Sequence, residues 1–112
     1  MRDLTFIWEE SPDNAFTVRA LIHGQTVGIA CGHWNDRTCE LEWVNIVANW
    51  QRHGVGTSLV RQVQCHFRHI TACPINSAGV ALVRHCGFTP SPESTVDWTW
   101  SEDPALTSDR DF

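Results

Sequence analysis

The sequence predicts a single domain of the mixed α/β class (α+β), in which strands come first and two main helices follow. Its 112 residues are enough to bury one hydrophobic core and too few for two. Apolar and polar residues alternate from Leu4 to Val47, with turn residues between the runs, which predicts four antiparallel strands. Beyond Val47, apolar residues recur at helical spacing in two segments. This order indicates an antiparallel meander followed by helices.

Turn-forming residues separate the first four strands. The run Ser11-Pro12-Asp13-Asn14 ends the first strand, and Gly24 can supply the positive φ that a tight hairpin needs. A further turn follows at Asn35-Asp36-Arg37. The predicted strands span residues 4–9, 16–22, 26–33 and 38–47.

The second half of the chain predicts two helices with short strands between and after them. The first helix, residues 57–67, follows a glycine-interrupted break and carries its apolar residues on one face. Asn76 or Ser77 can cap the second helix, and Gly87 provides a left-handed stop after Cys86. Short strands are predicted at residues 69–73 and 96–100. The domain is thus expected to span residues 1–100.

The last segment, residues 101–112, differs in composition from the rest of the chain. It contains four acidic residues, one proline and little apolar content, so we expect a mobile acidic tail.

Composition excludes several function classes. The net charge of −5 disfavours nucleic acid as a partner, because phosphate backbones attract basic surfaces. No apolar run reaches membrane-spanning length, and no secretory signal is recognisable at the N-terminus. We therefore expect a cytoplasmic protein with no membrane contact.

Cysteine spacing gives no support for a metal site. The five cysteines are scattered without a C-x-x-C pair, so neither a disulfide framework nor a zinc ribbon is expected. Cys65, His69 and Cys73 would share one side of a continuous helix, but the β-prone residues before Pro74 argue against that helix. We expect no metal.

One loop has the pattern of an anion site. Gln51-x-x-Gly54-x-Gly56 lies between the fourth predicted strand and a helix, where unpaired N–H groups and the positive end of the helix dipole converge. A second pattern follows: Asn76-x-x-Gly79-x-x-Leu82-Val83-x-x-x-Gly87-Phe88. In order and spacing the two motifs resemble the signatures of the GCN5-related N-acetyltransferase (GNAT) family.

The resemblance covers roughly residues 26–88 and implies a mixed, mostly antiparallel sheet of six to seven strands with two main helices. It implies acetyl-CoA as co-substrate, with backbone groups at Ile46 and Val47 pairing with the pantetheine arm and the Asn76 side chain bonding the same arm. The backbone amides that would hold the pyrophosphate are those of Gln51, Arg52, His53, Gly54, Val55, Gly56 and Thr57.

Two carboxylates are the candidate catalytic residues. Acetyl transfer requires a deprotonated amine, and the family often uses a carboxylate on the fourth strand as base. Glu40 lies sixteen residues before Gly56, as does the glutamate of the histone-modifying branch, and Glu42 is its neighbour on the same face. A bulge in the strand would redirect one of them, so both remain candidates.

The chain departs from the family pattern in two ways. Val83 stands where the family usually has a tyrosine that protonates the departing thiolate, which leaves His85, Cys86 or a water as substitutes. About five residues also replace the two helices that the family inserts between its first two strands. The acceptor site should then be open, either to a bulky amine acceptor such as a protein segment or to a second subunit in a homodimer.

Two functions of different classes follow. The first is an N-acetyltransferase that moves acetyl from acetyl-CoA to a primary amine, with Glu40 or Glu42 as base. The alternative is a catalytically silent relative that binds CoA or a partner protein. Release of thiol in the presence of an amine would separate them.

Overall fold

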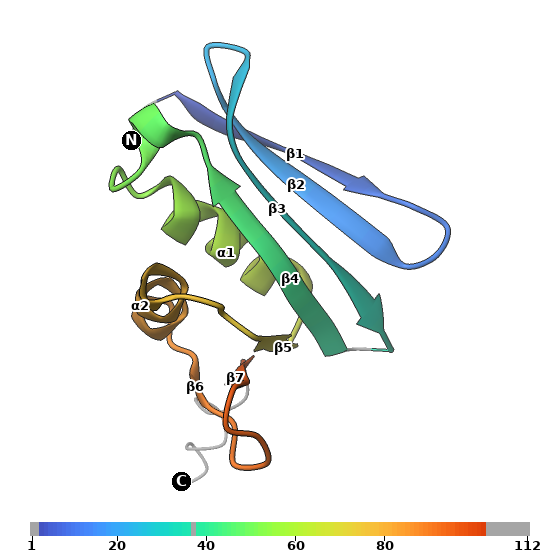
Figure 1. Ribbon diagram of the computed structural model, residues 1–112. Coiled ribbons are helices and arrows are strands. Elements are labelled where there is room, and N and C mark those ends of the chain that lie inside the picture. The colour runs from blue at the N-terminus through green and yellow to red at the C-terminus, as the bar shows by residue number, and fades with distance from the viewer. Residues whose placement is uncertain (1–2, 37, 103–112) are drawn as a thin grey trace, which may run out of the picture.

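The computed structural model describes residues 3–36 and 38–102 and shows one mixed sheet covered on one face by two helices (Figure 1). The seven strands lie in the order β1-β2-β3-β4-β5-β7-β6. All neighbouring strands are antiparallel except β4 and β5, which are parallel. This confirms the expected mostly antiparallel sheet with two main helices.

The first four strands form a continuous meander, as the alternation predicts. They are β1 (Leu4–Glu10), β2 (Ala15–Ile22), β3 (Gln25–Asn35) and β4 (Thr38–Ile46). The remaining elements are the short 3₁₀ helix η1 (Ala48–Trp50), α1 (Val55–His66), β5 (His69–Ala72), α2 (Ser77–His85), β6 (Thr89–Pro90) and β7 (Trp98–Ser101).

The structure adds one strand and shifts several boundaries by one or two residues. The two-residue strand β6 was not predicted and pairs only with β7. β7 includes Ser101, which sequence analysis assigned to the tail, and the N–H of Glu102 donates to the carbonyl of Arg68. α1 begins at Val55, two residues earlier than predicted, because the left-handed Gly54 starts it. The rest of the predicted tail, residues 103–112, lies outside the described residues.

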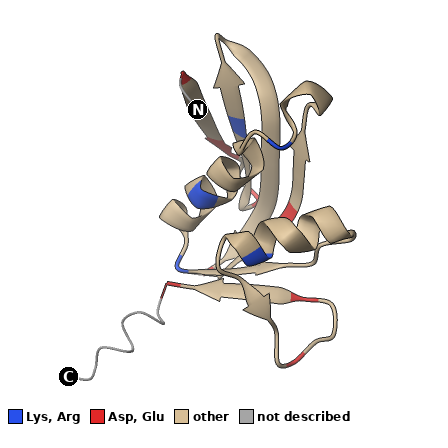
Figure 2. Ribbon diagram, turned by 90° about the vertical axis from the view of Figure 1, so that its left-hand side faces the viewer, with Lys and Arg blue, Asp and Glu red and all other residues tan. Residues whose placement is uncertain are grey.

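Both helices pack on the same face of the sheet, which Figure 2 shows with the helices in front. A single apolar cluster joins the inward residues of β2 to β5 with Leu59, Val60 and Val63 of α1 and with Val83 of α2. The Gln64 side chain donates to the carbonyl of Cys86 at 2.9 Å and ties the end of α2 to α1. No polar or charged residue is buried in residues 3–36 and 38–102, so the core is wholly apolar.

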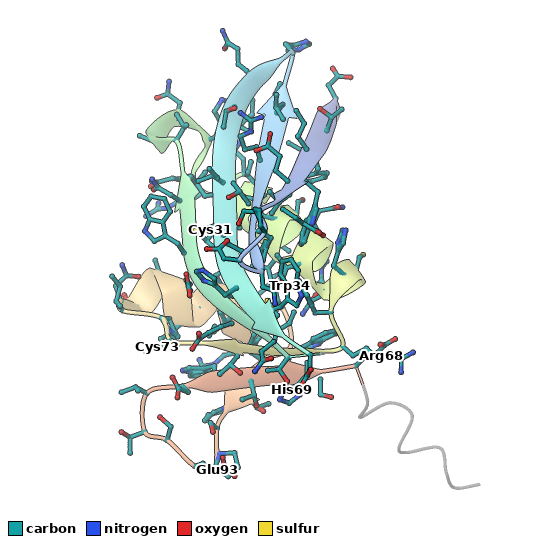
Figure 3. The ribbon with its side chains drawn as sticks, turned by 90° about the vertical axis from the view of Figure 1, so that its right-hand side faces the viewer. Cys31, Trp34, Arg68, His69, Cys73 and Glu93 are labelled. Atoms are coloured by element: carbon teal, nitrogen blue, oxygen red, sulfur yellow. The ribbon has the colours of Figure 1, made fainter. Side chains whose placement is uncertain are left out.

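The other face of the sheet has no helix over it in the described part of the chain, and Figure 3 looks onto this face. The turn between β1 and β2 spans only residues 11–14, so no inserted helix is available there to cover it. Ile7 and Trp43 are 40% and 55% exposed on this uncovered face. Within residues 3–36 and 38–102, neither helix combines the length and the hydrophobicity needed to span a bilayer.

A β-bulge in β4 shapes the middle of the sheet. Cys31 pairs with Trp43 while the next residue, Gly32, pairs with Leu41, so β4 carries one extra residue, Glu42. Gly32 is required here, because a Cβ at this position would lie 2.1 Å from the carbonyl oxygen of Glu40. The bulge thus depends on a close backbone contact that only glycine allows.

Candidate active site

The loop before α1 presents unpaired backbone N–H groups at a helix N-terminus. The N–H groups of residues 52–57, all of which the structure describes, donate to no backbone carbonyl, and no side chain caps α1. Arg52 and Gly54 have left-handed φ values of 67° and 87°, which bend the loop tightly in front of the helix. The loop therefore has the geometry of an anion site.

No acidic side chain in the first turn of α1 opposes an anion at the N-terminus of this helix. The sequences of α1 and α2 contain no acidic residue, and each helix carries an arginine, Arg61 or Arg84 (Figure 2). Arg52 lies in the loop itself and is exposed. The positive end of the α1 dipole is consequently not offset by a carboxylate in its first turn.

Gln51, the first residue of the motif, differs from the rest of the loop. Its N–H donates to the carbonyl of Ala48 at 3.3 Å, and its side-chain Nε2 donates to the carbonyl of Ile46 at 3.1 Å. The amide predicted to hold pyrophosphate is thus engaged within the protein. Gln51 instead fastens the loop to the end of β4.

Only one of the two backbone positions predicted for the pantetheine arm faces away from β3. Val47 donates its N–H to Val27 at 2.9 Å, and its carbonyl accepts from Trp50 at 2.7 Å. Backbone groups of successive strand residues point to opposite edges, so those of Ile46 point away from β3. The prediction that Ile46 and Val47 both pair with one ligand conflicts with this alternation. The N–H of Ile46 is the suitable group, because the carbonyl of Ile46 already accepts from Gln51.

Asn76 caps α2. Its side-chain Oδ1 accepts from the N–H of Gly79 at 2.8 Å. Asn76 is thus the cap, of the two residues that the sequence offered. This bond uses the oxygen, and the NH₂ group of the same amide carries the donors that a pantetheine contact requires.

β4 and β5 separate at the bulge. They are paired only from Thr38 to Leu41 on β4 and from His69 to Ala72 on β5. From Glu42 onward, the edge of β4 that faces away from β3 has no strand partner in the described residues. The parting of the strands leaves a free backbone edge that runs from the bulge toward the loop.

A cavity of about 230 Å³ lies where the two strands part. Both predicted catalytic residues, Glu40 and Glu42, line it, together with Asp97 from the segment before β7. Cys73, at the end of β5, is a further lining residue and is labelled in Figure 3. Three carboxylates around one small cavity favour a cationic ligand.

Sequence analysis missed one residue of this region, His33 on β3. Its Nδ1 lies 2.8 Å from Oε2 of Glu42. This hydrogen bond is the main cause that raises the pKa of His33. Partial desolvation lowers this pKa, and the charges of Glu42, Asp13 and Glu40 raise it further. The turn predicted at Asn35-Asp36-Arg37 was the signal that could have located His33, because a hairpin there pairs β3 with β4 and brings His33 opposite Glu40.

The position of the missing tyrosine carries no proton donor. Val83 is 4% exposed and belongs to the core. Cys86 is also buried, and burial raises the pKa of its thiol. Of the substitutes considered from the sequence, the histidine His85 is exposed on α2.

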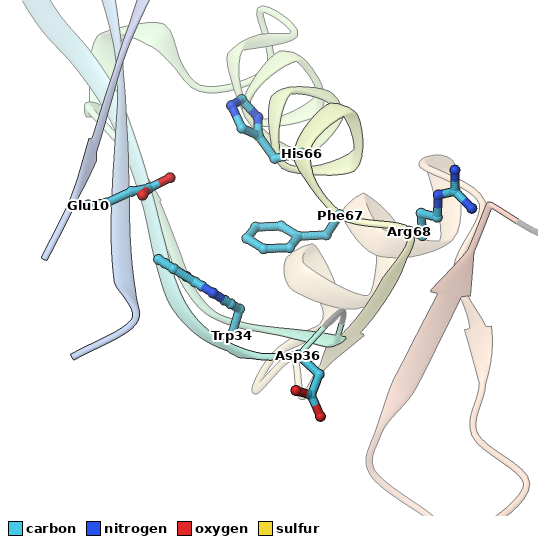
Figure 4. Close-up of a pocket in the computed structure, with 6 residues that line it drawn as sticks. All are labelled: Glu10, Trp34, Asp36, His66, Phe67 and Arg68. Atoms are coloured by element: carbon cyan, nitrogen blue, oxygen red, sulfur yellow. The ribbon is translucent and has the colours of Figure 1, made fainter. Parts of the chain in front are cut away.

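A larger cavity, about 500 Å³, lies elsewhere, at the C-terminal end of α1 (Figure 4). Trp34 and Phe67 form its apolar part, with ring centroids 5.9 Å apart, and Glu10, Asp36, His66 and Arg68 complete the lining. It contains none of the predicted site residues. Its size alone does not make it the active site, because both predicted catalytic carboxylates line the smaller cavity instead.

No group of three or more potential metal ligands occurs in residues 3–36 and 38–102. α1 ends at His66 and β5 begins at His69, so Cys65, His69 and Cys73 do not lie on one helix.

The profile of the acetyltransferase (GNAT) family matches residues 1–88. This chain belongs to that family. Among curated proteins, none matches the sequence. The fold is shared with solved GNAT structures despite low sequence identity. These similarities show the architecture, and the chemistry has to be inferred from the residues of the site.

Three of these structures illustrate the likeness. A GNAT acetyltransferase from Elizabethkingia anophelis with acetyl-CoA bound has a TM-score of 0.74 and 14% identity, over 90% of this chain and 99% of that one. The IAA acetyltransferase from Bacillus cereus has a TM-score of 0.73 and 14% identity, over 88% and 99%. GCN5 from Tetrahymena has a TM-score of 0.69 and 15% identity, over 81% and 70%.

Proposed function

We propose that this protein transfers an acetyl group from acetyl-CoA to a primary amine. The observation that carries the proposal is the placement of two sites at the ends of one unpaired strand edge. The uncapped loop before α1 lies at one end, and the acid-lined cavity at the bulge lies at the other. Coenzyme and acceptor would meet at the bulge.

The coenzyme arm fits the strand edge between these sites. Residues 42–46 span about 13 Å at the rise of a β-strand, which is comparable with an extended pantetheine arm. The amides of residues 52–57 would hold the pyrophosphate, and the backbone of Ile46 and the NH₂ group of Asn76 would bond the arm. Binding along an open edge requires no rearrangement of the core.

The carboxylates supply what the acceptor needs. An ammonium group would enter the cavity beside Glu40, Glu42 and Asp97, and one of the two glutamates would take or relay its proton. The free amine attacks the thioester carbon, a C–N bond forms, and the C–S bond breaks. A thiol has a pKa near 8.5, so the CoA thiolate can leave without a donor at the position of Val83.

The acceptor is proposed to be bulky, such as a protein segment with a free amine. The support is the uncovered face of the sheet. It is continuous with the cavity, because the exposed residues Glu40 and Glu42 belong to both. A homodimer in which a second copy covers this face is the other arrangement, and sedimentation equilibrium at micromolar concentration distinguishes a monomer from it.

A silent coenzyme or partner-binding protein is the second candidate function, favoured by the buried Val83 at the usual donor position. Such a protein would bind acetyl-CoA without releasing thiol when amines are added.

Calorimetric titration with acetyl-CoA and with CoA tests the coenzyme site. In Gly54→Glu a carboxylate would face the pyrophosphate, and at about 5 Å their repulsion of about 3 kcal/mol predicts an affinity loss of about 100-fold. Gly24→Glu is the matched control, since Gly24 is also left-handed, at φ 78°, with open space around it in the β2–β3 turn. Equal affinity in both variants would contradict the proposed cradle.

Thiol release then separates the two functions. The wild type is mixed with acetyl-CoA and, in turn, spermidine, a peptide with a free N-terminal amine, and a peptide with one lysine. Release that depends on an amine supports acetyl transfer. Tight acetyl-CoA binding with no release from any of them supports the silent binder.

A further inference from the structure

We propose that His33 is the proton acceptor of this site, held in place by Glu42, while Glu40 binds the acceptor ammonium. The inference rests on the proposed function and assigns separate roles to the two carboxylates that the sequence left equivalent.

The hydrogen bond between His33 and Glu42 fixes the imidazole. A carboxylate 2.8 Å from Nδ1 accepts the Nδ1–H, and this tautomer leaves the lone pair on Nε2. Both side chains are half-exposed, at 49% and 41%, so the free nitrogen is reachable by an acceptor and by water. A carboxylate that orients a histidine in this way also stabilises the imidazolium that forms when it takes a proton.

The bulge creates the pair. His33 lies directly opposite Glu40 in the register, and the extra residue Glu42 follows on the same strand. Because residues 40 and 42 are two apart before the alternation changes, their side chains share a face. The imidazole therefore sits beside both carboxylates that line the cavity.

The two carboxylates have different partners. The carboxylate of Glu42 is engaged by His33, whereas the carboxylate of Glu40 has no hydrogen bond or ion pair with any residue in the described part of the chain. A carboxylate without an internal partner is free to bind an ammonium group, and one already bonded to an imidazole is a weaker proton acceptor.

The charges around His33 come from two elements. Glu40 and Glu42 lie on β4, and Asp13 lies in the turn between β1 and β2. The thiol of Cys31, the neighbour on β3, has a raised pKa and stays neutral at neutral pH. The raised pKa of His33 makes neutral imidazole a stronger base, and the fraction in that form grows as the pH rises through this value.

The proton balance of the step is complete. The ammonium at Glu40 gives one proton to Nε2 of His33, and the amine attacks the thioester carbon. The C–N bond forms, the C–S bond breaks, and the thiolate leaves with the electron pair. The new amide nitrogen releases its second proton through water, and the thiolate takes up that proton. The half-exposed imidazolium returns its proton to solvent.

The pH dependence of kcat tests the assignment, with acetyl-CoA and the amine of the panel above that is acetylated fastest. We expect the wild-type rate to rise with pH through one histidine-like inflection. His33→Gln should lower kcat at pH 7 by about 100-fold and remove the inflection. Glu42→Gln should move the inflection to lower pH. Glu40→Gln should raise KM and move the inflection by less, because the charge of Glu40 is the smallest of the causes that raise the pKa of His33.

His69→Gln is the matched control. His69 is an exposed histidine on β5, and its side chain lies on the same face of the sheet as that of Thr71, which lines the cavity. It should leave the profile unchanged. The titration of the histidine ring protons by NMR gives a readout without turnover: the resonance lost in His33→Gln should titrate at lower pH in Glu42→Gln.

Outcomes separate this inference from the function on which it rests. Turnover by His33→Gln with the wild-type pH profile would overturn the role of His33 and leave acetyl transfer intact. No amine-dependent thiol release by the wild type would overturn both. A His33 resonance unaffected by Glu42→Gln would refute the coupling of the pair.

Discussion

The two faces of the sheet differ in what their side chains do. The face under α1 and α2 buries apolar residues of β2 to β5, and these form the sheet side of the hydrophobic core. The uncovered face has the same strands and the same backbone hydrogen bonds, yet it presents His33, Glu40 and Glu42 to solvent. Stability is therefore expected to depend on one face and chemistry on the other, so that site residues can change with little effect on folding.

The largest effect should come from the covered face. Ile70 on β5 is fully buried, and Ile70→Ala should lower the free energy of unfolding by about 3 kcal/mol through lost burial and a cavity. Urea denaturation followed by tryptophan fluorescence measures it. A loss below about 1 kcal/mol would mean that this face does not carry the stability.

An intermediate effect is expected at the bulge, where the two faces are linked. In Gly32→Ala the new Cβ would lie 2.1 Å from the carbonyl oxygen of Glu40, so β4 must shift. We expect a loss of about 2 kcal/mol from strain, together with a His33 resonance that titrates closer to an ordinary histidine. Native stability and an unchanged His33 titration would show that the bulge does not need glycine.

The smallest effect should come from the uncovered face. Ile7→Ala makes the same chemical change as Ile70→Ala at a side chain that is 40% exposed, so we expect a loss of less than about 1 kcal/mol. The two isoleucines form a matched pair in the same urea experiment. If Ile7→Ala were as costly as Ile70→Ala, the uncovered face would itself be buried, as in a homodimer, and the midpoint would then depend on protein concentration.

Sequence alone located the elements that depend on local patterns. The alternation in β1 to β4 and the glycine before α1 are set by residues close in the chain, as is the cap of α2, for which the sequence left Asn76 and Ser77 open. β6 was missed because two residues carry no periodicity, and its strand pairing comes entirely from β7.

The geometry of the candidate site could be predicted only in part, and the missing contacts have one cause. Glu40 and Glu42 were found as neighbours on a strand, and the structure brings both to the same cavity. The contact of Glu42 with His33, and the orientation of Val47 toward β3, depend on cross-strand register. A bulge shifts that register by one residue, which no local pattern reveals.

The bulge also has a consequence for how this strand tolerates insertions and deletions. Leu41 and Val44 both face the helices although they are three residues apart, because the extra residue restores their common orientation. Loss of one residue at Glu42 would give regular two-residue spacing and keep both side chains in the core. A relative that carries such a deletion could retain the fold and lose the carboxylate in a single genetic event, so a sequence alignment of this region calls for a one-residue gap at the bulge.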